Sequence, residues 1–297
     1  MTDTSAVTWL RTARRVWLAV VVLAPGWALH RLDWQTTRSY LTTLRGPWLT
    51  ATAMAALGSH LCRGSAWWAS QRAVGQAATL GETLRHYLIA NLGKYVPGSI
   101  WQVTTAAWLT RRANRLSPLQ ASATFGILLV ATQLVGAALA MPDFLRNRGV
   151  VVLFGLALAV AGAWLVLVST RVGRWLAPLR EQPLKLVIVI GWSSVGALVS
   201  WALLGLSMLT TQWALRPPLT VAPEDIIGAI RTMSASGVAG FLAVFAPAGV
   251  GVREMVMVDL LRPDIGLEAA VVVATVHRIV LTLVEILAAA FCWRRPR

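Results

Sequence analysis

The sequence predicts an all-α protein that crosses a membrane several times. Of its 297 residues, 57% are hydrophobic and only 13% are charged, and its mean hydropathy is +0.64. Several long runs carry almost no charge, and a helix needs about 20 apolar residues to cross the hydrocarbon core. These runs are apolar on nearly all sides, which is typical of helices surrounded by lipid rather than helices on a soluble protein.

The formal net charge of +15 raises the question of nucleic-acid binding. The basic residues, however, lie in short segments beside apolar runs, where the positive-inside rule places them and where they attract anionic lipid headgroups. No nucleic-acid-binding module is present. The two cysteines, Cys62 and Cys292, have no histidine or cysteine partners at metal-ligand spacing. We therefore expect the bilayer as a partner, no nucleic acid, no metal and no cofactor.

Basic residues orient the predicted spans of the first half. A span over 13–31, interpreted as a retained signal anchor, follows an arginine cluster that predicts a cytoplasmic N-terminus. These arginines are Arg11, Arg14 and Arg15. A second span over 47–62 leads back to the cytoplasm at Arg63. The apolar segment 86–108 has basic residues on both sides, so it is predicted to enter and leave the membrane at the cytoplasmic face.

Three further full spans are predicted after this first hairpin. They cover 119–140, 149–168 and 186–213, and the last of them leads to an acidic loop outside the membrane. The final span, 268–292, is followed by arginines, which places the C-terminus in the cytoplasm as well. The segment 226–262 must then start and finish outside, which predicts a second hairpin from the opposite face.

Six full spans and two oppositely inserted re-entrant hairpins are the pattern of an inverted repeat in one transmembrane domain, 1–297. Its approximate halves are 1–140 and 149–297, and we expect it in a bacterial cytoplasmic membrane. An alternative is that Pro97 and Pro247 only kink ordinary spans, because proline and glycine are common in membrane helices.

Proline and glycine interrupt both hairpin segments in a similar way. The first interruption covers 95–101 (YVPGSIW), and the second covers 245–254 (FAPAGVGVRE). Backbone released from helical hydrogen bonding is tolerated at membrane depth only where it is buried in protein or lines a polar cavity. The two interruptions therefore predict a binding site between the repeats.

Ionisable side chains inside apolar segments are functional candidates, because each costs roughly 2.5 to 3.5 kcal/mol at the membrane centre. Four basic ones are predicted to face a shared cavity and to bind a lipid phosphate. They are Lys94, Arg231, Arg253 and Arg278. Helix N-termini after Pro97 and Pro247 would add backbone N–H donors for the same anion.

Small and aromatic residues complete the predicted substrate site. Gly98, Gly249 and Gly251 would let the backbone approach the anion, and Trp101 would line the cavity. Glu254 is included because it follows the interruption at Pro247 together with Arg253.

The acidic residues leave two alternatives open. Glu254, His277 and Glu285 are candidates for proton coupling, although His277 also fits a histidine satisfied in the interior. In the alternative, Arg253 and Glu254, with Arg278 and Glu285 on one helix face, form an internal charge network that is purely structural.

Segments 91–101 (NLGKYVPGSIW) and 247–254 (PAGVGVRE), together with Arg111 and Arg278, resemble the flippase-like transmembrane domain of lysylphosphatidylglycerol synthases. The resemblance covers roughly 10–292 and implies a protein that moves phospholipids, hopanoids or polyprenyl-linked sugars. Two differences stand out. Ala248 occupies the first glycine position of the family's usual Pro-Gly-Gly-x-Gly motif, and the cytosolic aminoacyl-transfer domain of the bifunctional members is absent from this sequence.

The predicted function is binding and translocation of an anionic phospholipid or a polyprenyl-linked glycolipid, with a glycosyltransferase or synthase as a potential partner. One alternative is a non-transporting accessory subunit of a membrane glycosyltransferase or lipid-modifying complex. A membrane transferase is the other. An enzyme is not expected, because the 12 acidic residues include no Asp-x-Asp arrangement and the chain has no Gly-rich phosphate loop.

Overall fold

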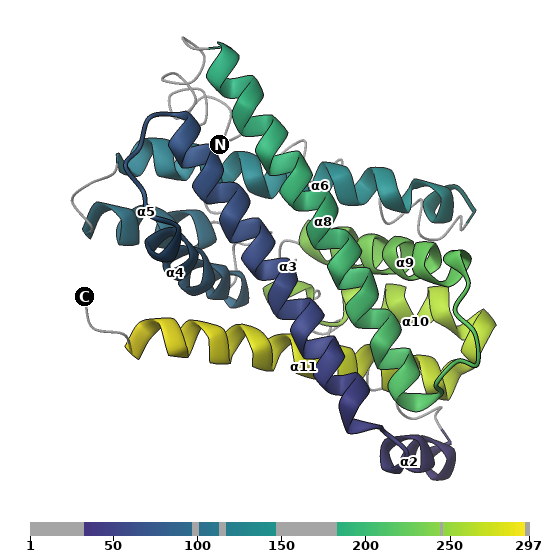
Figure 1. The fold of residues 1–297 in the computed structure, drawn as a ribbon. Helices are drawn as coiled ribbons and strands as arrows, with labels where there is room; N and C mark the ends of the chain where they lie inside the picture. Colours follow the sequence, from purple (N-terminus) through teal and green to yellow (C-terminus); the bar gives the residue numbers. More distant parts are fainter. Residues whose placement is uncertain (1–32, 97–100, 113–116, 147–182, 244–245, 295–297) are drawn as a thin grey trace, which may run out of the picture.

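The computed structural model describes residues 33–96, 101–112, 117–146, 183–243 and 246–294, and this described part of the chain is helical with no strands (Figure 1). Two short 3-10 turns, η1 (Leu92–Tyr95) and η2 (Pro247–Gly249), interrupt the helices. The helices are α2 (Trp34–Thr42), α3 (Gly46–Ala73), α4 (Leu80–Asn91), α5 (Trp101–Arg112), α6 (Pro118–Arg146), α8 (Pro183–Leu215), α9 (Pro223–Leu242), α10 (Val252–Ile265) and α11 (Leu267–Arg294).

Local sequence explains where several helices begin. The Thr79 side chain accepts a hydrogen bond from the Glu82 N–H and caps α4. Proline opens α6, α8 and α9, where its missing N–H costs no helical hydrogen bond. Gly266, at φ +84°, separates α10 from α11, because this left-handed conformation suits glycine.

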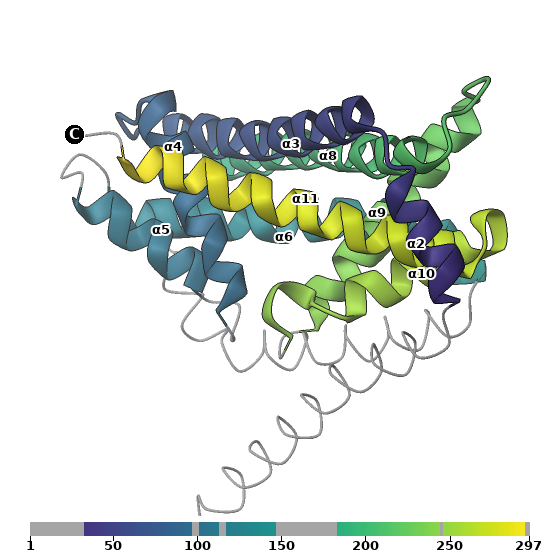
Figure 2. The same ribbon diagram turned by 90° about the horizontal axis from the view of Figure 1, so that it is seen from below.

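Helices α3 and α8 pack side by side in opposite directions (Figures 1 and 2). The Arg45 N–H donates to the Ala214 carbonyl at 3.0 Å, so the start of α3 meets the end of α8. Further along, a Cβ added at Gly196 would lie 2.3 Å from the Ala66 Cβ. Small residues therefore let the two backbones approach closely, as is common between membrane helices.

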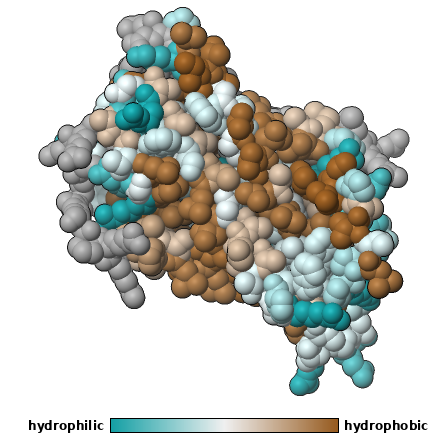
Figure 3. Space-filling model, viewed as in Figure 1, coloured by the Kyte–Doolittle hydropathy of each residue, from teal (hydrophilic) through white to brown (hydrophobic). Residues whose placement is uncertain are grey.

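Three described helical segments are long and apolar enough to cross a membrane, in agreement with an integral membrane protein. They are Pro118–Asp143, Pro183–Leu215 and Leu267–Trp293. Helix α8 leaves large apolar side chains exposed, among them Val187, Val195 and Leu198. Figure 3 shows hydrophobic side chains over the middle of one face and at its upper tip, while hydrophilic side chains gather mainly at the left side and the lower right end. A continuous apolar surface of this kind fits contact with lipid.

The two predicted interruptions separate pairs of shorter helices that pack against each other. Helices α4 and α5 have 12 residues each. Each is therefore roughly 18 Å long, against about 30 Å of hydrocarbon. Helices α9 and α10 have 20 and 14 residues. In Figure 1 the two pairs lie at opposite ends of the molecule, and η1 and η2 contact each other between them.

One predicted boundary is wrong. Helix α3 has 28 residues and continues to Ala73, whereas the sequence analysis ended this span at residue 62. Arg63 therefore lies inside a helix and not in a cytoplasmic loop. The predicted spans 13–31 and 149–168 fall outside the described residues.

Candidate functional site

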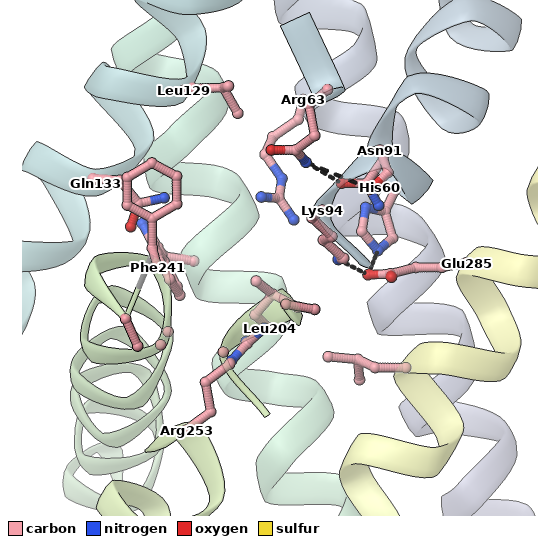
Figure 4. Close-up of a pocket in the computed structure, with 18 of the residues that line it drawn as sticks. His60, Arg63, Asn91, Lys94, Leu129, Gln133, Leu204, Phe241, Arg253 and Glu285 are labelled. Atoms are coloured by element: carbon pink, nitrogen blue, oxygen red, sulfur yellow. Dashed lines mark hydrogen bonds and ion pairs between the residues drawn. The ribbon is translucent and has the colours of Figure 1, made fainter. Parts of the chain in front are cut away.

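A cavity of about 100 Å³ lies where the two interruptions meet (Figure 4). Since a single water needs about 10 to 15 Å³ of such space, the cavity has room for several waters or for a group the size of a phosphate. Apolar side chains form much of its wall. Its polar and charged lining residues are His60, Arg63, Asn91, Lys94, Gln102, Gln133, Arg253 and Glu285.

Glu285 of α11 anchors the first interruption. Lys94 Nζ donates to Glu285 Oε1 at 2.5 Å, and the Tyr95 hydroxyl donates to Oε2 at 2.8 Å. His60 Nε2 of α3 lies 3.0 Å from Oε1, close enough for an ion pair when the imidazole is protonated. Glu285 is only 4% exposed, and a buried carboxylate requires partners of this kind. Glu285 therefore holds η1 against α11.

Arg278, seven residues before Glu285 on α11, anchors the second interruption. Its Nη2 donates to the Ala248 carbonyl at 3.1 Å, and its Nε lies 3.4 Å from Glu254 Oε1. Glu254 Oε2 in turn accepts the Gly251 N–H at 2.6 Å and caps the start of α10. A single helix, α11, thus fixes both interrupted segments.

Glycines of α9 and η2 make room for Arg253. A Cβ added at Gly240 would lie 2.0 Å from Arg253 Cγ, and one added at Gly237 would lie 3.7 Å from Arg253 Nη2. Gly249 packs so closely that a Cβ there would lie 2.6 Å from the Gly240 Cα. The Arg253 side chain therefore lies along the glycine face of α9 and reaches the cavity.

Two arginines point into the cavity without a counter-ion among the described residues. Within the described part of the chain, neither Arg63 of α3 nor Arg253 of α10 makes an ion pair or a side-chain hydrogen bond, and Arg63 Nε is fully buried. Figure 4 shows their guanidinium groups directed into the same central space. The buried Gln133 Oε1 also has no hydrogen-bond partner among the described residues. An anion with several oxygens would satisfy both guanidinium groups.

The predicted site residues divide into those that line this cavity and those that support it. Lys94, Gly249, Arg253 and Glu285 line it. Pro247 and Gly251 belong to the second interruption but do not contribute to the wall.

A second, smaller cavity of about 10 Å³ adjoins Arg253. The predicted residues Glu254, His277 and Arg278 line it. His277 is 2% exposed, and its Nε2 lies 2.9 Å from the Ser207 hydroxyl. This environment matches the alternative of a histidine satisfied in the interior. Arg278 and Glu254 match the alternative of an internal charge network.

The remaining predicted residues lie elsewhere. Trp101 is 45% exposed at the start of α5, and Arg231 is half-buried on α9; neither lines a cavity described above. Pro97 and Gly98 lie outside the described residues.

Ala248 adopts a backbone conformation that favours glycine. Its φ is +52°, the only positive φ of a non-glycine residue in the described part of the chain. Gly249 and Gly251 follow with φ of +70° and +86°. Ala248 is also the position at which the resembled motif has its first glycine, so the local backbone is compatible with that motif.

Three residues of the cavity, Arg63, His60 and Gln133, are not among the predicted site residues. The sequence predicts a loop at Arg63, because basic residues beside apolar runs are usually topological signals. The available signal was the spacing of His60 and Arg63, three residues apart in a stretch without a helix breaker, which places both on one helix face. No comparable pattern singled out Gln133.

Comparison with protein-family models, curated proteins and solved structures finds no match to this chain, so its function is inferred from the cavity itself.

Proposed function

We propose that this protein binds an anionic phospholipid or a polyprenyl-linked glycolipid in the cavity between its interrupted segments and moves it across the membrane. The observation that carries the proposal is the pair Arg63 and Arg253, which reach one cavity without an internal counter-ion among the described residues. A buried charge without a partner is costly, and a lipid phosphate would supply both the charge and the oxygen acceptors.

The architecture that we propose around this cavity is an inverted repeat of six spans and two re-entrant hairpins. The hairpins would be α4 with α5, entering from the cytoplasm, and α9 with α10, entering from the opposite face. The short lengths of α4 and α5 and the contact between η1 and η2 support this arrangement. Substrate sites of such repeats lie near the midplane, at discontinuous helices.

Helix α11 offers a route for coupling between the halves. Glu285 holds the first interruption and Arg278 holds the second, and the Arg278 guanidinium also lies 5.9 Å from the Tyr95 ring centroid. A movement of α11 would therefore shift both interruptions together. Rocking of one repeat against the other would then expose the cavity to one side at a time.

The test is native mass spectrometry of the purified protein with its retained lipids, comparing wild type with Arg63→Gln and Arg253→Gln. Arg262→Gln is a matched control, because Arg262 lies on α10 as well but is 59% exposed and pairs with Asp259. All variants are first checked for unchanged thermal unfolding and elution volume.

Selective retention of an anionic lipid by wild type and by Arg262→Gln, with loss in the two other variants, would support the proposal. Equal, unselective retention by all four proteins would make Arg63 and Arg253 structural and would favour an accessory subunit that transports nothing.

A further inference from the structure

We infer that the cavity selects a phosphate group with two negative charges, as in a lipid phosphate monoester or a diphosphate, over a phosphate diester with one. This inference rests on the proposed function and names the headgroup class for the same site.

Among the described residues, the charged side chains that line the cavity carry a net charge of +2. They comprise three cations, Arg63, Lys94 and Arg253, and one carboxylate, Glu285, with the His60 imidazole counted as neutral. The residues at the interruptions that the structure does not describe, 97–100 and 244–245, carry no ionisable side chain.

The net positive charge of the cavity lining resides on Arg63 and Arg253, because the other charged residues are paired. Lys94 is 2.5 Å from Glu285 and is neutralised there, with Tyr95 donating to the other carboxylate oxygen. Arg278 and Glu254 lie 3.4 Å apart beside the smaller cavity and neutralise each other in the same way. Arg63 and Arg253 are left to balance the ligand.

Two guanidinium groups match a dianion in hydrogen bonding as well as in charge. Each offers a planar fork of N–H donors, so the pair can bind bidentately to at least three oxygens. A phosphate monoester has three terminal oxygens and a charge near −2, about −1.5 to −2 at pH 7. A diester has two terminal oxygens and a charge of −1, which would leave one positive charge uncompensated.

The apolar part of the cavity wall increases the selectivity for a phosphate monoester over a diester. Leu129, Leu204 and Phe241 surround the space into which the arginines point (Figure 4). Apolar side chains around a charge lower the local dielectric constant. They therefore strengthen the attraction between the arginines and a dianion, and they raise the free-energy cost of an arginine whose charge the ligand does not neutralise. A diester is therefore expected to bind at least about tenfold more weakly, which corresponds to about 1.4 kcal/mol.

The experiment compares the binding of two lipids with identical acyl chains, dioleoyl phosphatidate as the monoester and dioleoyl phosphatidylglycerol as the diester. Dioleoyl phosphatidylcholine serves as the zwitterionic reference. Each lipid is titrated into detergent-solubilised protein at pH 8, and the bound fraction is read by native mass spectrometry. The proteins are wild type, Arg63→Gln, Arg253→Gln and the control Arg262→Gln.

The expected result is a preference of about tenfold or more for phosphatidate in wild type and Arg262→Gln, falling to less than about threefold in each of the other variants. Equal binding of phosphatidate and phosphatidylglycerol, lost in both cavity variants, would overturn the charge selection while the proposed lipid site stands. If phosphatidate and phosphatidylglycerol both bind no more tightly than phosphatidylcholine, the inference and the proposed function are both overturned. A phosphatidate preference that persists in both cavity variants would overturn the assignment to Arg63 and Arg253.

Methyl phosphate, titrated without lipid, separates a lipid ligand from a soluble one. Binding at least about tenfold weaker than that of phosphatidate would show that the acyl chains contribute and would support the lipid site. Equal affinities would support selection of a dianion but would overturn a lipid as its source.

Discussion

At the scale of single residues, the charged side chains near the interruptions have two different roles. Glu285 and Arg278 make partly buried contacts with the backbone or side chains of the interrupted segments. Arg63 and Arg253 reach the cavity without such partners among the described residues. Removing a member of the first group should mainly change stability, whereas removing a member of the second should mainly change ligand binding.

Gly240→Ala is expected to displace Arg253, because the new Cβ would lie 2.0 Å from Arg253 Cγ. Overpacking of this kind costs about 1 to 3 kcal/mol of stability. The variant should retain less anionic lipid in native mass spectrometry, as Arg253→Gln does. Gly228→Ala is the matched control on the same helix, since nothing lies within 4 Å of a Cβ there. Retention at the wild-type level in folded Gly240→Ala would show that Arg253 does not bind the lipid.

Ala248→Gly is expected to stabilise the protein by up to about 1 kcal/mol. The left-handed conformation costs a non-glycine residue about 1 to 2 kcal/mol, and the greater chain entropy of unfolded glycine offsets part of that gain. Ala246→Gly is the control two residues earlier, because Ala246 has an ordinary φ of −90° and should lose stability on the same change. Denaturant unfolding in detergent measures both variants. A loss of stability in Ala248→Gly similar to that in Ala246→Gly would contradict the strain at Ala248.

At the scale of elements, α11 is the helix that positions the site. It contacts η1 and α4 of the first pair and α10 of the second, and it also packs on α3 and α8. Its two ionic anchors, Arg278 and Glu285, lie on one face because seven residues make about two helical turns. The cavity therefore depends on α11 even though only Leu281 and Glu285 of this helix line it.

Glu285→Gln is expected to destabilise the protein by about 3 to 5 kcal/mol, because it leaves Lys94 without its buried counter-ion. Amide hydrogen exchange should accelerate over η1 more than over α8. Lys94→Gln combined with Glu285→Gln should cost less than the sum of the single changes, because the two side chains are in direct contact. Glu224→Gln, on the exposed first turn of α9, is the control and should change stability by less than about 1 kcal/mol. Additive effects of Lys94→Gln and Glu285→Gln would contradict the anchor.

The elements could be predicted from the sequence more reliably than the site. Proline and glycine at 247–251 predict correctly that a helix is interrupted there, because those residues act through local backbone geometry. The roles of Arg63 and Arg278 are harder to predict for a different reason. Whether an arginine is a topological signal, an anchor or a ligand depends on which acceptors the tertiary fold brings to it. The acceptors of Arg278 come from α10 and η2.

At the scale of the whole molecule, the arrangement of helix ends is compatible with the predicted topology. In Figure 1 the ends of α3 and α11 and the start of α6 lie toward one end of the molecule, while the end of α8 and the start of α11 lie toward the other. The hydrogen bond from Gln76, just after α3, to Gln120 at the start of α6 agrees with this placement. The 3-10 turns η1 and η2 contact each other between the two pairs, where the cavity lies.

Accessibility of single cysteines tests the two hairpins, in a background in which Cys62 and Cys292 are replaced by serine. Gly81→Cys and Arg111→Cys, near the outer ends of α4 and α5, should react with a membrane-impermeant thiol reagent only from the cytoplasmic side. Glu224→Cys and Asp264→Cys, near the outer ends of α9 and α10, should react only from the outside. All four residues are exposed. Kinked full spans would instead place the two members of each pair on opposite sides.

The most direct test of the central claim is a leaflet-transfer assay in reconstituted vesicles, with a fluorescent phosphatidate whose outer-leaflet signal is quenched chemically. Wild type and Arg262→Gln should transfer the lipid faster than protein-free vesicles, and Arg63→Gln and Arg253→Gln should lose that acceleration while remaining folded. Transfer that is equally fast in all four proteins, or no faster in wild type than in protein-free vesicles, would contradict the account of an anion-binding translocation cavity.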